Sequence, residues 1–411
     1  MSTSNLKFPF KITSKHFAKN KNAYYQWLRE NEPVHFSRYF MMKVCLLSRY
    51  EDCVSLLKDP RFVRNRHTAT GGSKLPFPIP MAKSLQALSE SMITEDDPEH
   101  RRLKSLVHKA FTSRAINQLG ERIECLTHEL LDKAEAESTA NGSVDLMQAY
   151  SLPIPVTVIS EMMGIEAEDM PKFIRGMKVL SEGVTGWNLV RTLLWDMRFL
   201  LKFVRELIKK KRQNPGDDIL TSLIQAESNG DKLSEDELMS MVFLLIIAGY
   251  ETTVHLINIS VITLLKNPEQ LQLLRDNPEL IDSTVEEVLR FDGPIQGTKP
   301  AYATEEVTLH GVIIPKGTMV IPLIGAGNHD PDVFENPEVF DIARQPNPHL
   351  GLGHGIHYCL GAQLARLETK IAIKNLLDRN LNLQLAVKPE ELEMQHMPLF
   401  LRYKSLPVIM G

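Results

Sequence analysis

The sequence predicts a mainly α-helical protein with a minor amount of β-structure. Helical periodicity dominates from Pro98 to about Leu280, and turn-forming residues divide it into separate helices. Runs rich in β-branched or alternating apolar residues predict strands near 34–47, 300–325 and 381–408. The composition, 43% apolar and 24% charged, is that of a globular protein. Since no internal repeat or clear linker is present, we expect a single large unit over residues 1–411.

The longest predicted helix spans residues 234–266 and contains no proline. It begins with Ser234 and a glutamate three residues later, the pattern of a capping box. At about 1.5 Å per residue it would extend nearly 50 Å. Its apolar stretch is interrupted by Glu251, His255 and Asn258, which would be costly in the centre of a bilayer. We therefore expect a buried core helix and no membrane anchor.

Charge and cysteine content narrow the class of protein. The formal net charge is -4, whereas nucleic-acid-binding domains usually carry a strong basic excess, so no nucleic-acid partner is expected. The four cysteines are too few for a disulfide framework and form no Cys-x-x-Cys pair. The first ten residues lack the apolar core of a secretion signal. These features predict a cytoplasmic location.

The segment 349–361 carries the clearest chemical signal. It reads His-Leu-Gly-Leu-Gly-His-Gly-Ile-His-Tyr-Cys-Leu-Gly and precedes a predicted helix over 362–377. Three glycines in five residues would let the backbone approach a large flat ligand, and a helix N-terminus favours the thiolate form of Cys359. This combination suits an anionic sulfur ligand. Two other interpretations stay open, namely a turn with a structural cysteine and a zinc site through Cys359 with His349, His354 and His357.

Residues Leu352–Gly361 resemble the haem-binding loop of the cytochrome P450 family, which typically reads Phe-Gly-x-Gly-x-His-x-Cys-x-Gly. Every fixed position matches except Leu352, where the family has phenylalanine. The resemblance implies that Cys359 is the thiolate ligand of the iron of haem b. It also implies haem contacts from Leu352, Gly353, His357 and Gly361. Leucine covers less of the sulfur than phenylalanine, which would raise the reduction potential. The alternative, that Leu352 fills the same space after repacking and leaves the potential unchanged, stays open.

Further motifs in the same order extend the resemblance to about residues 20–408. Within the long helix, residues 248–253 read Ala-Gly-Tyr-Glu-Thr-Thr and resemble the family's oxygen-activation motif. The resemblance implies that Thr252 holds water and stabilises dioxygen during its activation, and that Glu251 helps to deliver protons. Ala248 and Gly249 would leave room for dioxygen. The residues by themselves predict hydroxyl groups that bond back to helix carbonyls, which is compatible with that role.

Glu287 and Arg290 lie three residues apart and share one face of a predicted helix, where they can pair. As an exposed ion pair they would contribute little to stability. The resemblance instead implies that they form a buried network with Arg344. Their role would then be to brace the haem-binding core.

Cationic residues are expected to hold the haem propionates. His100 and Lys104 lie one helical turn apart and can address one carboxylate, and the resemblance assigns His357 to the same role. The family more often has arginine in the place of Lys104. It also supplies an arginine just before an Ala-x-Glu-Asp-like stretch. Residues 299–306 of this chain contain no arginine, and Lys299 is the expected replacement.

The resemblance implies insertion of one atom of dioxygen into a substrate C–H bond, while the other atom leaves as water. No flavin or iron–sulfur motif is present, so electrons from NAD(P)H would arrive through a separate ferredoxin or flavodoxin and its reductase. Expected substrates are apolar small molecules such as a fatty acyl chain, free or carrier-bound, a macrolide, a terpenoid or a steroid. Epoxidation is an alternative to hydroxylation. A haem-thiolate peroxygenase, isomerase or dehydratase and a non-enzymatic haem sensor remain alternatives, against which the Glu251–Thr252 pair argues.

The resemblance implies substrate contacts from a loop near residues 76–92, a helix near 180–195 and three further apolar segments. An apolar stripe is more often core than pocket, so each assignment needs structural support. The expected contact residues are Phe77, Ile79, Phe243, Leu244, Ile247, Ile295, Gln296, Leu399 and Phe400.

Overall fold

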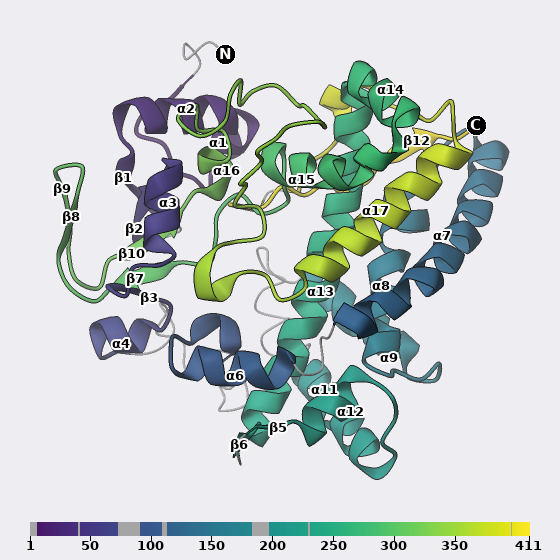
Figure 1. The fold of residues 1–411 in the computed structure, drawn as a ribbon, viewed down its shortest axis with the longest axis horizontal. Coiled ribbons are helices and arrows are strands. Elements are labelled where there is room, and N and C mark those ends of the chain that lie inside the picture. Colours follow the sequence, from purple (N-terminus) through teal and green to yellow (C-terminus); the bar gives the residue numbers. More distant parts are fainter. Residues whose placement is uncertain are drawn as a thin grey trace.

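The computed structural model describes residues 6–39, 42–72, 91–108, 113–182, 197–228, 231–395 and 397–411. Within this part the chain is mainly helical with small sheets, which confirms the expected fold class (Figure 1). The α-helices are α1 (Lys15–Lys19), α2 (Lys21–Asn31), α3 (Tyr50–Leu56), α4 (Arg66–Thr70), α6 (Glu99–His108), α7 (Ser113–Asn141), α8 (Pro153–Met162), α9 (Met170–Glu182), α11 (Met197–Gln213), α12 (Ile219–Gln225), α13 (Glu235–Lys266), α14 (Pro268–Asp276), α15 (Ile281–Phe291), α16 (Ile324–Gly327) and α17 (Ala362–Arg379).

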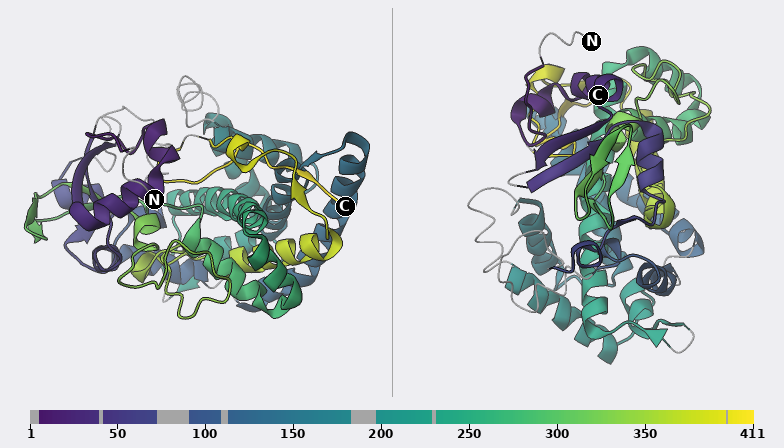
Figure 2. Two further views of the ribbon diagram at one scale, coloured as in Figure 1. Left: turned by 90° about the horizontal axis from the view of Figure 1, so that it is seen from above. Right: turned by 90° about the vertical axis from the view of Figure 1, so that its left-hand side faces the viewer.

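The strands lie mostly where the sequence predicts them. They are β1 (Val34–Tyr39), β2 (Met42–Leu47), β3 (Phe62–Val63), β4 (Val144–Asp145), β5 (Glu227–Ser228), β6 (Asp231–Lys232), β7 (Ala301–Ala303), β8 (Val307–Leu309), β9 (Val312–Ile314), β10 (Met319–Pro322), β11 (Gln384–Leu385) and β12 (Pro407–Ile409). The largest sheet has the order β1-β2-β10-β7-β3. Its strands gather on one side of the molecule, and the second panel of Figure 2 shows them face-on. The β3–β7 edge of this sheet lies next to the site described below.

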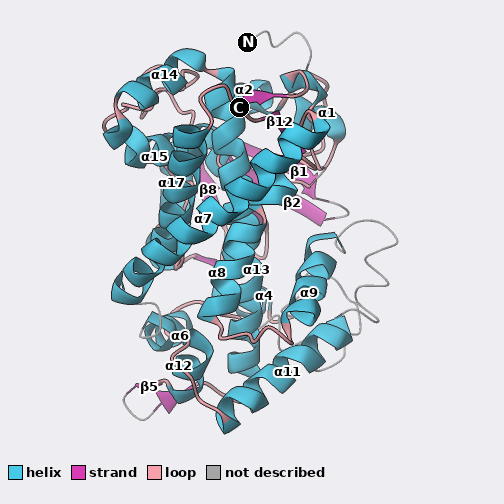
Figure 3. Cartoon of the chain, turned by 90° about the vertical axis from the view of Figure 1, so that its right-hand side faces the viewer, coloured by secondary structure: helices cyan, strands magenta, loops and turns pink. Residues whose placement is uncertain are grey.

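Helix α13 forms the centre of the helical part. Ser234 caps its N-terminus, and the expected capping box is present, since Ser234 and Glu237 each accept a backbone hydrogen bond from the other. By length and composition the helix could cross a membrane, but most of it is buried inside the protein. It packs against α8, α15 and α17, and α7 packs on α8 and α17 (Figure 3). The apolar stretch is therefore explained by burial in the core.

Two short features of the helical part follow from local sequence. Helix α4 begins after Asn65, which accepts a hydrogen bond from the backbone amide of His67, and ends at Gly71, which has a φ of 66°. Helix α8 begins at Pro153, because the first helical position needs no amide hydrogen. Residues 73–90 lie outside the described residues.

Between α16 and α17 the chain is largely irregular, and a buried ion network holds it in place. Arg290 donates two hydrogen bonds of 2.8 Å to Glu287, and Arg344 Nε donates a third of 3.2 Å. The Glu287 and Arg290 side chains are fully buried. The remaining donors of both arginines bind backbone carbonyls of the irregular segment. The structure thus brings together the three residues that the resemblance grouped.

We predict that Glu287→Gln destabilises the protein by about 3–5 kcal/mol, because it leaves two guanidinium groups without their buried counter-ion. The free energy of unfolding, from urea titration, measures the effect. Asp378→Asn is the control, since it removes one carboxylate from an exposed pair with Lys374 and should cost at most about 1 kcal/mol. Equal losses for the two variants would contradict a bracing role for Glu287.

Candidate functional site

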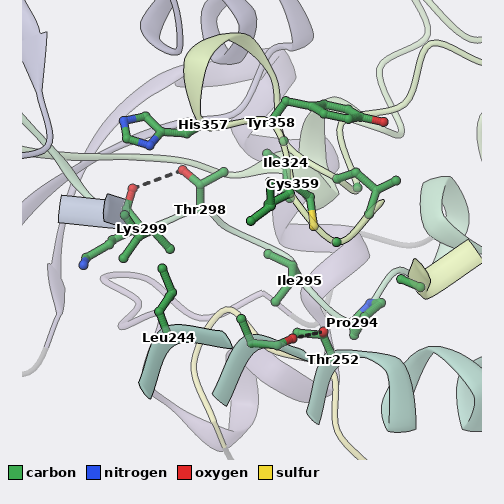
Figure 4. A pocket seen from close by; sticks show the side chains of 18 of the residues that line it. Leu244, Thr252, Pro294, Ile295, Thr298, Lys299, Ile324, His357, Tyr358 and Cys359 are labelled. Carbon is green, nitrogen blue, oxygen red and sulfur yellow. Dashed lines mark hydrogen bonds between the residues drawn. The ribbon is translucent and has the colours of Figure 1, made fainter. Parts of the chain in front are cut away.

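A cavity of about 560 Å³ lies between helix α13 and the loop that carries Cys359. In Figure 4 the sulfur of Cys359 points into this space from one side, and Thr252 lies on the helix across from it. The structure therefore brings the cysteine loop and the middle of the long helix to one site. The expected site residues found in its wall are His100, Lys104, Leu244, Ala248, Gly249, Thr252, Ile295, Lys299, Leu352, Gly353, His357, Cys359, Gly361, Leu399 and Phe400.

Three expected substrate contacts do not line the cavity. Phe243 is 4% exposed and belongs to the hydrophobic core, and Ile247, one turn further along the same face of α13, also lies outside the wall. Gln296 is buried and turns its amide to the carbonyl of Gly293 at 2.7 Å and to Lys21 at 3.3 Å. These three assignments are corrected. Phe77 and Ile79 lie outside the described residues, as does nearly all of the expected helix near 180–195.

Several wall residues were not expected from the sequence. They come from a strand, loops and helices that are distant along the chain, and no local pattern distinguishes them from ordinary core positions. The unexpected apolar ones include Ile159, Leu256, Leu289, Ile321, Ile324 and Pro398. Together with the expected apolar residues, they give the cavity a wall that consists mostly of hydrocarbon side chains. The site is therefore suited to an apolar ligand.

Cys359 lies just before the N-terminus of α17, and its backbone amide donates to the carbonyl of Leu352 at 2.9 Å. Its side chain is surrounded by protein but open to the cavity. Burial raises the pKa of the Cys359 thiol, although the backbone amide of Gly361 and the charges of Arg366 and Lys104 act in the opposite direction. The backbone amide at the helix N-terminus therefore acts in the direction that the sequence predicts, but burial has the larger effect on this pKa.

Two glycines of the loop lie close to the protein's own backbone. At Gly351 an added Cβ would lie 2.6 Å from the carbonyl of Leu289, and at Gly355 it would lie 2.7 Å from that of Leu57. Close approach to the protein's own backbone, rather than to a ligand, therefore excludes a side chain at these positions. At Gly361, by contrast, the space beside the backbone is open. This glycine lines the cavity and leaves room next to Cys359.

The loop is also tied to helix α15. Glu286 accepts two hydrogen bonds from Arg366 and one of 2.9 Å from His349. Burial alone would raise the pKa of Glu286, but these partners lower it to about 2. Arg366 in turn contacts the hydroxyl of Tyr358, next to the cysteine.

Among the described residues no group of three or more His, Cys, Asp or Glu side chains could hold a metal ion, so the zinc interpretation lacks the ligands it requires.

One end of the cavity is rich in cationic groups. Lys104 donates to the carbonyl of Ile356 at 2.6 Å, and the rings of His100 and His357 stand 4.3 Å apart. Burial, followed by the nearby cations, lowers the pKa of His357 to about 3. Burial likewise lowers the pKa of Lys299 to about 8. The Nε2 atom of His357 is buried and has no hydrogen-bond partner among the described residues.

On the opposite side, Thr252 donates to the carbonyl of Ala248 at 2.9 Å, as the sequence led us to expect (Figure 4). Glu251 does not reach the cavity wall and pairs instead with Arg402 at 2.5 Å. His255 lies one turn further along α13, and burial together with the charge of Arg402 lowers its pKa to about 3. The hydroxyl thus faces the cavity while the neighbouring carboxylate is held behind the helix.

Comparison with known proteins decides the family. Residues 25–407 match the family described as Cytochrome P450. The chain belongs to the cytochrome P450 family. It is accordingly a monooxygenase, an oxidoreductase that uses haem and dioxygen.

Among the relatives of this P450 is the polyketide biosynthesis cytochrome P450 PksS of Bacillus subtilis, 38% identical over 98% of both chains. Its solved structure has a TM-score of 0.89, with 98% of this chain and 100% of that chain covered at 37% identity. The vitamin D(3) 25-hydroxylase of Pseudonocardia autotrophica is 38% identical over 96% of this chain and 95% of its own. The structure of P450BioI with an acyl carrier protein ligated to hexadec-9Z-enoic acid has a TM-score of 0.86 and 35% identity, covering 96% and 99% of the chains.

The residues of the cavity fit the haem of a P450. Cys359 offers a sulfur ligand that opens into the cavity, and the apolar wall suits the faces of a porphyrin. At one end, Lys104, Lys299 and the unpartnered His357 Nε2 supply the donors that two carboxylates need. Each part of haem b therefore has a chemical counterpart in the wall.

We predict that Cys359→Ser abolishes the red-shifted Soret band of the reduced carbonyl complex, because that band depends on thiolate ligation. Visible spectra of the reduced protein before and after addition of carbon monoxide measure it. Cys125→Ser removes an exposed cysteine and should leave the band unchanged. A normal band in Cys359→Ser would exclude this cysteine as the ligand.

Proposed function

We propose that this P450 hydroxylates or epoxidises an apolar small molecule in the cytoplasm. Electrons from NAD(P)H would reach it through a separate ferredoxin or flavodoxin and its reductase. The single observation that carries the proposal is the cavity, in which Cys359 faces Thr252 across a space walled mainly by hydrocarbon side chains. Such a wall favours binding of an apolar substrate by removing its surface from water.

Among apolar substrates we favour a fatty acyl chain, either free or attached to a carrier protein. Support comes from the structurally similar P450BioI, which was solved with an acylated carrier protein. Leu244, Ile295, Leu399 and Phe400 line the cavity and would contact the chain. Macrolides, terpenoids and steroids are the alternative substrate classes, and a substrate screen would distinguish them from a fatty acyl chain.

The proposed roles of the chain's own groups follow from their positions. When bound, haem supplies the redox chemistry that activates dioxygen. Cys359 holds it by its sulfur, while Lys104, His100 and His357 orient its carboxylates. Thr252 uses its hydroxyl hydrogen to bind the Ala248 carbonyl, so its oxygen lone pairs remain available to accept a hydrogen bond from water in the cavity.

Glu251 is proposed to replenish the proton that the water held by Thr252 gives up. In the structure its carboxylate is paired with Arg402, and both side chains are largely buried, at 12% and 5% exposed. Glu251 must therefore leave this pair before it can exchange a proton near Thr252. The neutral His255 beside Arg402 adds no competing positive charge. The ion pair with Arg402 thus holds the Glu251 carboxylate behind the site.

The proposal predicts that fatty acids shift the haem spectrum from low to high spin with affinity that rises with chain length. Each added buried methylene contributes about 0.8 kcal/mol, which is roughly fourfold in affinity until the cavity is filled. Spectral titration with acids of increasing length measures this, and consumption of NAD(P)H and oxygen with surrogate redox partners tests turnover. Full turnover with hydrogen peroxide and none with NAD(P)H would favour a peroxygenase instead.

We predict that Thr252→Ala retains haem and substrate binding but loses coupling, because the cavity then lacks the hydroxyl that holds water. The ratio of product to NAD(P)H consumed should fall about tenfold or more, since a positioned proton donor typically contributes about 10²-fold or more. Hydrogen peroxide should rise correspondingly. Thr252→Ser keeps the hydroxyl and is the matched control. An unchanged ratio in Thr252→Ala would remove Thr252 from proton delivery.

A further inference from the structure

Arg64 is a cationic residue beside the haem site that the sequence did not single out. It directly follows β3, which pairs antiparallel with β7 so that Phe62 lies opposite Ala303 and Val63 opposite Tyr302. One step further along this register, Arg64 falls opposite Ala301. Its Nη2 atom donates to Thr298 at 3.4 Å, and Thr298 is part of the cavity wall. The sheet therefore brings Arg64 to the cationic end of the cavity.

The Arg64 side chain is buried without a counter-ion of its own. It is 8% exposed, and its Nη1 atom has no hydrogen-bond partner among the described residues. The nearby carboxylate of Asp96 is used by the backbone amides of Arg64 and Asn65, at 2.7 and 2.9 Å. Glu95 accepts from the side chain of Asn65. A buried guanidinium with an unused N–H group needs an acceptor.

Two further donors lie at the same end. His357 Nε2 is buried and has no hydrogen-bond partner among the described residues, and the ammonium-bearing side chain of Lys299 lines the cavity. Figure 4 shows Lys299 and His357 on the same side of the cavity. Cationic groups gathered in this way favour an anion between them.

We propose that Arg64 binds one of the two haem propionates. Arg64 would take the place of the arginine that this chain lacks before Ala303, and Lys299 would lie beside it. In the structure Arg64 contacts the wall through Thr298, and haem binding would turn Nη1 toward the carboxylate. The planar guanidinium can then keep Nη2 on Thr298 while Nη1 binds the propionate, which a lysine cannot do. The inference rests on the proposed haem site.

The test measures haem loss from the purified holoenzyme. Arg64→Gln should release haem to excess apomyoglobin about ten- to a hundredfold faster than the wild type, the effect of losing one hydrogen bond between charged groups. Arg61→Gln is the matched control, because Arg61 lies three residues away, is exposed and pairs with Asp59. It should release haem at the wild-type rate. Arg64→Lys should lose haem at a rate between those of Arg61→Gln and Arg64→Gln, since lysine keeps the positive charge but lacks the planar, forked guanidinium.

A second measurement separates propionate binding from a merely structural role. Resonance Raman spectra of the ferric holoenzyme report the bending band of the propionates, which shifts when a hydrogen bond to them is lost. The band should move in Arg64→Gln and stay in place in Arg61→Gln. If Arg64→Gln loses haem faster while its band is unchanged, Arg64 only braces the β3–β7 edge and the inference fails.

The spectrum of the reduced carbonyl complex distinguishes this failure from failure of the haem site itself. If the wild type shows no thiolate band, the proposed site is wrong and the inference on Arg64 falls with it. If the band is normal and Arg64→Gln matches the wild type in both haem loss and propionate bending, only the assignment of Arg64 is overturned.

Discussion

The haem side of the structure depends on the hydrogen bonds that the buried carboxylate of Glu287 accepts from two arginines. The segment between α16 and α17 has little regular structure, so its backbone carbonyls need other donors. Arg290 and Arg344 supply these donors, and both are oriented by Glu287. The adjacent residue, Glu286, anchors the end of the same segment through His349 and Arg366. One turn of α15 therefore fixes the irregular chain that leads to Cys359.

The sequence predicted the elements around the site well but not which helix face lines it. The capping box and the absence of proline were enough to place α13, because they are local features. The expected contact stretch on that helix contained two stripes, however. Leu244, Ala248 and Thr252 recur every four residues and face the cavity, whereas Phe243 and Ile247 are displaced by one position, or about 100°, and face elsewhere. Both stripes are apolar, so hydrophobicity alone could not separate them.

The same displacement explains the arrangement of Glu251 and Thr252. Glu251 precedes Thr252 by one position, about 100° around the helix, and its carboxylate lies behind the helix while the hydroxyl faces the cavity. Arg402, from the C-terminal part of the chain, receives that carboxylate. Nothing near Glu251 in the sequence indicates this partner, because it depends on a contact between residues 151 positions apart. Arg64 escaped prediction for the same reason, since only the pairing of β3 with β7 brings it to the site.

Burial at the site opposes the charged states that its function needs. It raises the pKa of the Cys359 thiol, lowers those of His357 and Lys299, and leaves an N–H group of Arg64 without an acceptor. The unused N–H group of Arg64 and the burial of the Lys299 ammonium weaken the folded protein, and nearby residues offset these effects only in part. A ligand that combines a metal for the sulfur with carboxylates for the cations relieves all of them at once. Such a ligand binds the folded chain and not the unfolded one, so its binding free energy adds directly to the stability of the fold. Until haem is bound, the Glu287 network and the contacts of Glu286 must therefore hold the loop in place.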